Sequence, residues 1–169
     1  MRNDKRYPVT IAPFHFDNFK ELSNAEAREY FNWYMEVKIN RIQNLQNYIN
    51  ENEKLKIQLD YSVQSLENVW DWYKKEIETE DMTEEDYQKL CKGRPEWLQE
   101  RIREEKTKVS ILTWCICQDI AVYFGEVMIK KHEALHWDYF TKPKNAINIK
   151  EPIITGLEKD YIFLHFKYW

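Results

Sequence analysis

The chain has 169 residues, of which 43% are hydrophobic and 32% charged, and its formal net charge is −4. This composition is typical of a folded protein, and the length predicts one domain spanning residues 1–169. The acidic balance disfavours nucleic-acid binding, which needs a basic face. The three cysteines do not suggest a disulfide framework, and the N-terminus shows no signal-peptide pattern, so we expect a cytoplasmic protein.

The first half of the chain predicts two long helices after an extended segment. Prolines at positions 8 and 13 favour an extended conformation over residues 7–19. Ser23 and Glu26 match a capping box, which predicts a helix over residues 24–50. Ser62 is the expected N-cap of a second helix that ends near residue 77.

The middle of the chain begins with an acidic stretch. Residues 76–86 hold many carboxylates and no basic residue. Within this stretch, Thr83 precedes three acidic residues, as at the start of a short helix. Gly93 and Pro95 indicate its end. A polar helix then follows over residues 96–106, and we expect Trp97 to face inward.

Residues 109–131 predict a helix that is apolar on most of its circumference and is therefore enclosed by its neighbours. Its polar residues argue against a membrane span. Asp119 and Glu126 lie on similar faces, and we expect them to anchor strand amides or an arginine such as Arg41 or Arg101. The alternative is a general acid and base with shifted pKa values. Gly125 indicates close approach of a neighbouring backbone.

The pattern changes to short strands after residue 135. Aromatic and β-branched residues predict strands over residues 136–141, 146–149, 152–155 and 161–168. Helices over residues 20–133 followed by strands over residues 136–169 predict an α+β fold. In this fold, helices pack around a buried central helix and precede a small antiparallel sheet.

The residues His132, Glu133 and His136 form the string H-E-x-x-H. In zinc hydrolases the two histidines bind the metal from one helical face, and the glutamate is the general base. Glu151 or Glu158 would be the third ligand. The helical pattern weakens after Lys131, however, so we expect no metal and no catalytic residue here, with zinc hydrolysis kept as an alternative.

Exposed aromatic and charged residues predict a surface for a protein partner. Trp70, Trp72 and Tyr73 cannot all face one core, so at least one ring should be exposed. The residues predicted to contact the partner are Trp72, Glu80, Asp81, Glu84, Glu85, Trp137, Lys142, Lys144 and Asn145.

Several segments resemble a family of small, uncharacterised bacterial proteins. They are residues 119–127, Trp137, residues 141–145 and 152–156, with residues 30–34 and 59–62 nearer the N-terminus. The general character of that family is similar to immunity proteins of bacterial toxin systems, which are cytosolic α+β domains without an active site. The resemblance implies a protein partner, a toxin neutralised by occlusion, and no cofactor. A basic nuclease toxin would suit the acidic stretch.

The leading hypothesis is therefore a non-enzymatic protein-binding domain, most specifically an immunity protein. Zinc hydrolysis and a role as a small scaffold subunit of a bacterial assembly are the alternatives. The sequence predicts neither membrane nor nucleic-acid binding, and it leaves the oligomeric state open.

Overall fold

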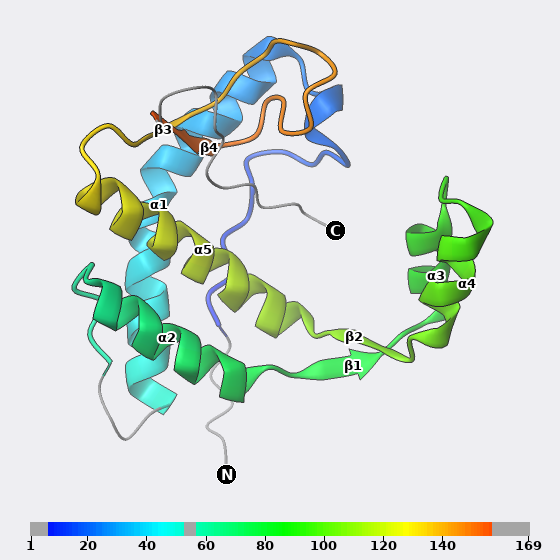
Figure 1. The fold of residues 1–169 in the computed structure, drawn as a ribbon, viewed down its shortest axis with the longest axis horizontal. Coiled ribbons are helices and arrows are strands. Elements are labelled where there is room, and N and C mark those ends of the chain that lie inside the picture. The colour runs from blue at the N-terminus through cyan, green and yellow to red at the C-terminus, as the bar shows by residue number, and fades with distance from the viewer. Residues whose placement is uncertain (1–6, 53–56, 157–169) are drawn as a thin grey trace.

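The computed structural model describes residues 7–52 and 57–156, and its architecture is α+β (Figure 1). A short 3-10 helix, η1 (Phe19–Glu21), precedes the main elements. The helices are α1 (Asn24–Asn52), α2 (Val63–Glu76), α3 (Glu84–Cys91), α4 (Glu96–Glu104) and α5 (Ile111–Lys131). The strands are β1 (Thr79–Asp81), β2 (Thr107–Val109), β3 (His136–Asp138) and β4 (Ile153–Thr155).

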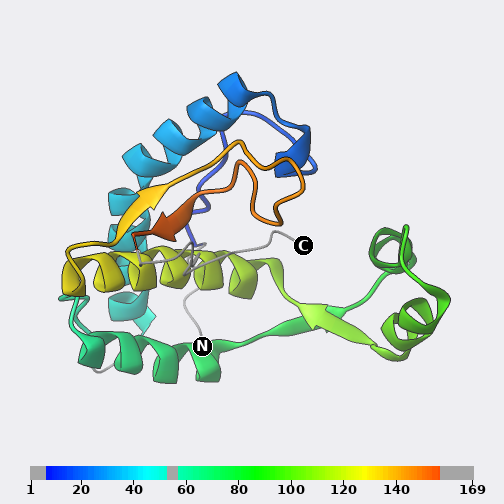
Figure 2. The same cartoon turned by 45° about the horizontal axis from the view of Figure 1, so that its top comes forward.

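Helix α5 is the centre of the core, as its apolar sequence predicts. It packs against α1 and α2, which lie on different sides of it (Figures 1 and 2). Its inward residues include Ile116, Val122 and Tyr123, and all are almost fully buried. Among the described residues, only α5 is long and apolar enough to cross a membrane, and 56% of its most apolar window is buried inside the molecule. Such burial is also what an enclosed core helix shows.

The predicted helix starts are confirmed by their hydrogen bonds. At the start of α1, the Ser23 amide donates to Glu26 Oε2 at 2.7 Å, and the Glu26 amide donates to Ser23 Oγ at 3.2 Å. Ser62 caps α2 by accepting from the Ser65 amide. Helix α5 begins two residues later than predicted, because Ser110 is its N-cap. Side-chain acceptors at these positions satisfy amides that the helices leave unpaired.

The β structure comprises two separate two-stranded antiparallel ribbons. In one, β3 pairs with β4 and Trp137 lies opposite Ile154. The other pairs β1 with β2, and it lies within the part of the chain where only helices were predicted. Its strands have three residues each, too few to show an alternating pattern in the sequence.

The strand predicted over residues 146–149 was wrong. The Ala146 amide donates to the Pro143 carbonyl at 3.0 Å, and the Lys150 amide donates to the Phe140 carbonyl at 2.8 Å. These bonds close the segment into turns, and Lys150 has a φ of 66°, outside the β region. The strand predicted over residues 161–168 lies outside the described residues.

The two carboxylates of α5 are anchors, as expected. Asp119 accepts from Arg41 Nε and from the Tyr7 hydroxyl, both at 2.6 Å, and thereby ties α1 and the N-terminal segment to α5. Glu126 accepts from Lys38 Nζ and from the Trp137 indole N–H, both at 2.6 Å. Arg41 is therefore the arginine partner of Asp119.

Gly125 does permit a close approach, but by a side chain rather than by the predicted backbone. A Cβ at this position would lie 2.8 Å from Cη2 of the Trp137 ring and 2.9 Å from Ile154 Cδ1. Both distances are shorter than a normal van der Waals contact. The missing side chain therefore lets the β3–β4 ribbon lie directly against α5.

Candidate protein-binding arm

Residues 79–109 form an arm that projects from the rest of the described chain (Figures 1 and 2). Its stalk is the β1–β2 ribbon, in which Thr79 pairs with Val109 and Asp81 with Thr107. Two further backbone bonds extend the pairing: the Met82 amide donates to the Lys106 carbonyl, and the Ser110 amide donates to the Glu78 carbonyl, both at 2.9 Å. The rest of the described chain, residues 7–52, 57–78 and 110–156, is termed the body.

The head of the arm, residues 83–105, is the helical hairpin α3–α4. Thr83 and Asp86 form a capping box at the start of α3. Gly93 has a φ of 71°, which allows the tight reversal between the helices. Only Cys91 is buried in α3, and α4 has no buried residue. The head therefore has very little hydrophobic core of its own.

Polar contacts hold the head against the stalk instead. Lys108 on β2 donates to Asp86 on α3 at 2.7 Å and lies 3.2 Å from Glu80 on β1. The Tyr87 hydroxyl donates to the Glu105 carbonyl at 2.5 Å. The hydrogen bond from Lys108, together with those from Thr83, holds the pKa of Asp86 well below its usual range.

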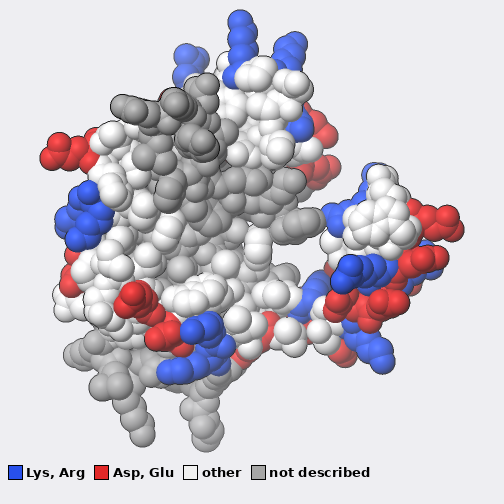
Figure 3. All heavy atoms as spheres, in the orientation of Figure 1, with Lys and Arg blue, Asp and Glu red and all other residues white. Residues whose placement is uncertain are grey.

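The arm is dense in charge, and its surface shows closely mixed blue and red atoms (Figure 3). Residues 79–109 contain nine acidic and seven basic residues. Asp81 and Glu84 make no ion pair within the described residues, and both are exposed. The arm therefore carries an excess of negative charge in an accessible position.

Apolar side chains are exposed on and beside the same arm. Trp97 on α4 is 66% exposed, contrary to the inward orientation predicted for it. Ile111, at the start of α5, is 69% exposed and Val109 is 46% exposed. A groove of about 500 Å³ lies where the arm meets the body. Its lining residues are Glu80, Asp86, Lys89, Leu90, Lys108, Val109, Ile111 and Trp114.

Four of the predicted partner-contacting residues lie together on this arm. Glu80 and Asp81 are on β1, and Glu84 and Glu85 form the first turn of α3. Glu85 pairs with Lys89 at 2.7 Å, and Glu80 lies near Lys108. The structure brings these four into one region because the ribbon and the head are adjacent in sequence.

The two tryptophans predicted to contact a partner are buried, and both predictions were wrong. Trp72 is 2% exposed in the core, so the exposed ring of its helix is Trp70, at 50%. Trp137 is 8% exposed because its ring packs over Gly125 and its N–H bonds Glu126. Neither indole is available to a partner.

Lys142, Lys144 and Asn145 are exposed in the loop after β3, as predicted. That loop belongs to the body, on the side where η1 and the first turns of α1 lie, and the arm is a separate feature (Figure 1). The predicted contact residues therefore divide into an acidic set on the arm and a basic set on the body.

The H-E-x-x-H residues do not share a helix. Helix α5 ends at Lys131 and His132 is its C-cap, with a φ of −133°. His136 lies in β3 opposite Thr155, and its Nδ1 is 3.2 Å from the Ala134 carbonyl. The helical geometry by which two histidines share a metal is therefore missing. No group of three potential metal ligands occurs in the described ranges, and Glu158 lies outside them.

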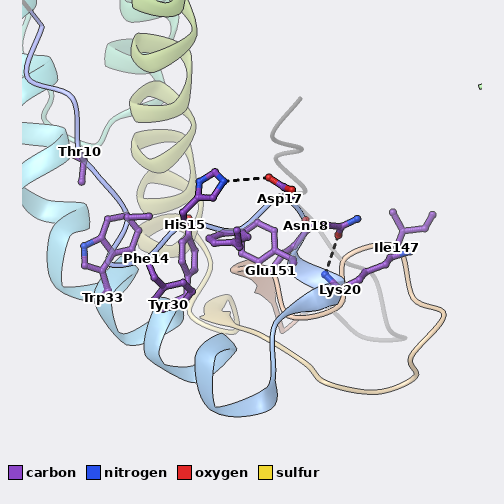
Figure 4. Close-up of a pocket in the computed structure, with 13 residues that line it drawn as sticks. Thr10, Phe14, His15, Asp17, Asn18, Lys20, Tyr30, Trp33, Ile147 and Glu151 are labelled. Atoms are coloured by element: carbon purple, nitrogen blue, oxygen red, sulfur yellow. Dashed lines mark hydrogen bonds and ion pairs between the residues drawn. The ribbon is translucent and has the colours of Figure 1, made fainter. Parts of the chain in front are cut away.

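A second pocket, of about 550 Å³, lies between the N-terminal segment and α1 (Figure 4). Aromatic rings, including Phe14, Tyr30 and Trp33, form much of its lining. His15 and Asp17, at its rim, are 3.4 Å apart and largely exposed. Polar residues such as Asn18, Lys20 and Glu151 complete the lining.

Asp119 is buried in the contact between α5, α1 and the N-terminal segment. Burial raises its pKa, and the neighbouring Arg41 and Tyr7 oppose that rise. Cys115 and Asp119 line a small pocket together, and burial also raises the pKa of the Cys115 thiol. A raised thiol pKa lowers the thiolate fraction, so Cys115 lacks the activation of a catalytic nucleophile.

Sequence reasoning missed the apolar residues of the arm. Val109 and Ile111 were assigned to the buried helix, since both continue its apolar pattern. The signal that distinguishes them is Ser110, an N-cap residue that separates the ribbon from α5.

No family model, curated protein or solved structure matches this chain. The resemblance to immunity proteins therefore stays a prediction.

Proposed function

We propose that this chain is a non-enzymatic protein-binding domain, and that toxin neutralisation by occlusion is its most specific form. The observation that carries the proposal is the arm: an acidic helical hairpin on a two-stranded stalk, with exposed Trp97 and with Ile111 beside it. Such a projection has little core to contribute to folding. It presents charge and apolar surface to another molecule.

The chemistry of the arm supports a basic protein partner. Its excess of carboxylates attracts a basic surface from a distance and raises the association rate. Exposed tryptophan is enriched among residues that dominate binding energy. An immunity protein needs both properties, because it must reach its toxin quickly and then cover the toxin's active site.

We expect the gene directly upstream of this chain's gene to encode a toxin-like protein, and the experiment is growth rescue in bacteria that express that protein. We expect the full chain to restore growth and the Asp81→Lys/Glu84→Lys variant to lose rescue. Both residues are exposed and lie outside the Lys108 contacts, so the fold is retained. Glu133→Lys, an equally exposed carboxylate on the body, is the matched control.

Three outcomes of that experiment contradict the proposal. Equal rescue by the arm variant and by the control would show that the arm does not bind the toxin. Loss of rescue only in a Lys142→Glu/Lys144→Glu variant would move the contact to the body loop. An absence of rescue by the unaltered chain would reject toxin neutralisation altogether.

The zinc alternative has a direct test. We expect metal analysis of untagged protein to find no stoichiometric zinc, and His132→Ala to leave the metal content unchanged, because the two histidines lie in different elements. Stoichiometric zinc that is lost in His132→Ala would restore the hydrolase hypothesis.

A further inference from the structure

We infer that the groove between the arm and α5 is the docking site for a basic amphipathic segment of a protein partner. This inference rests on the proposed function and adds the site and the chemistry of the segment. The groove lies where the stalk leaves the body, so its walls come from α3, from the ribbon and from the first turn of α5.

The floor of the groove is apolar. Leu90, Val109, Ile111 and Trp114 contribute to it, and the two aliphatic β-branched residues among them are about half or more exposed. A volume of about 500 Å³ is within the range of ligand-binding clefts and can accept a few large side chains. The occupant must therefore present an apolar face.

The charge around the groove determines the other face of the occupant. Residues 80–90 and 105–111 contain six acidic and three basic residues. The charged residues that line the groove are already paired: Lys108 contacts Asp86 and Glu80, and Lys89 contacts Glu85. The surplus comes from exposed carboxylates next to the lining, such as Asp81 and Glu84, which make no ion pair within the described residues. An acidic segment would meet the surplus carboxylates and be repelled, whereas a basic segment is complementary.

The test uses the full-length protein and a fluorescein-labelled peptide of about four helical turns, with leucine on one face and lysine on the other. Fluorescence polarisation measures its binding at low and physiological salt. A peptide with glutamate in place of every lysine is the charge control. We expect the basic peptide to bind, and its affinity to fall as salt rises.

The decisive variant is Ile111→Glu. Ile111 is the first residue of α5, where an acidic side chain complements the helix dipole, so this variant should fold. We expect it to weaken peptide binding by roughly tenfold, because it removes an apolar contact from the floor. The added negative charge would by itself strengthen attraction of a basic peptide, so a loss identifies the groove rather than the net charge.

Ile39→Glu is the matched control, because Ile39 is 65% exposed on α1 and does not line the groove. Ile111→Ala repeats the test without a change of charge, and circular dichroism confirms the folding of each variant. We expect Ile39→Glu to bind the peptide as the unaltered protein does.

The inference would be overturned if Ile111→Glu, Ile39→Glu and the unaltered chain bound the basic peptide equally well. It would also be overturned if the unaltered chain bound the acidic peptide as tightly as the basic one. Light scattering that shows a dimer lost only in Ile111→Glu would assign the groove to a second copy. Any of these results could occur while the arm variant Asp81→Lys/Glu84→Lys still abolishes growth rescue. In that case the proposed function stands, and only the assignment of the groove to a basic segment of the partner is rejected.

Discussion

At the scale of single residues, Gly125 and the carboxylate after it hold the β3–β4 ribbon on α5. The Trp137 ring occupies the space above the glycine, and its N–H reaches Glu126. Glycine costs about 1 kcal/mol of helix propensity relative to alanine. An alanine would regain this propensity, but its Cβ would overlap the Trp137 ring and Ile154.

We predict that Gly125→Ala lowers the free energy of unfolding by about 1 kcal/mol, measured by urea denaturation. Overpacking costs about 1–3 kcal/mol, which exceeds the propensity gain. In the Gly125→Ala background, Trp137→Phe should recover part of the loss because the smaller ring removes the clash. A stabilised Gly125→Ala variant would contradict this account of the glycine.

The buried Arg41–Asp119 pair gives a prediction with a defined pH dependence. Arg41→Met leaves Asp119 buried without its cation, at a cost of about 3–5 kcal/mol near pH 7. The folded-state pKa of Asp119 is already raised, and this substitution raises it further. The folded protein then binds a proton more tightly than the unfolded chain, so stability rises as pH falls through that pKa.

The destabilisation by Arg41→Met should therefore be smaller near pH 5 than near pH 7, measured by urea denaturation at each pH. Lys38→Met is the control, because it removes a partner of the less buried Glu126. A destabilisation independent of pH would show that Asp119 does not change its protonation in this range.

At the scale of elements, the two ribbons differ in what holds them. The β3–β4 ribbon packs on α5 through the buried residues Trp137 and Ile154. The β1–β2 ribbon and the head it carries depend on exposed polar contacts, chiefly those of Lys108. The arm should therefore open locally without unfolding the body.

We predict that Asp86→Asn increases hydrogen exchange in residues 79–109 and leaves exchange in α5 unchanged. The pKa of Asp86 is lowered in the folded state, so its contribution is present above the unfolded pKa near 3.9. This stabilisation is lost as pH falls toward the folded-state pKa of Asp86. Hydrogen exchange in the arm of the unaltered protein should therefore increase in acid. Glu100→Gln on α4 is a suitable control, and equal protection in both variants would contradict the role of Asp86.

At the scale of the whole molecule, the arm and the body divide the tasks of binding and folding. The bonds from Ser110 to Glu78 and from Met82 to Lys106 make Glu80 and Lys108 a hydrogen-bonded pair of the ribbon, which a two-residue turn can join. We predict that replacing residues 81–107 with Asn-Gly shifts the Tm of the body by no more than about 5 °C. Thermal circular dichroism measures this, and loss of the cooperative transition would show that the body needs the arm.

The sequence alone predicted much of this fold, because the signals concerned are local. Capping residues such as Ser23 and Ser62, and the apolar pattern of α5, depend on neighbours a few residues away, and they predicted the helices and the α+β class. The end of α5 near Lys131, and with it the absence of a helical H-E-x-x-H site, followed from the same kind of signal.

Only the tertiary structure decided which surfaces face solvent. Trp72 and Trp97 both lie on amphipathic helices, yet Trp72 is buried beside Tyr48 of α1 whereas Trp97 projects into solvent on the arm. The short pairing of residues 79–81 with 107–109 separates them, because it carries α3 and α4 away from the core. Contacts between residues distant in sequence determine burial, and no local pattern encodes them.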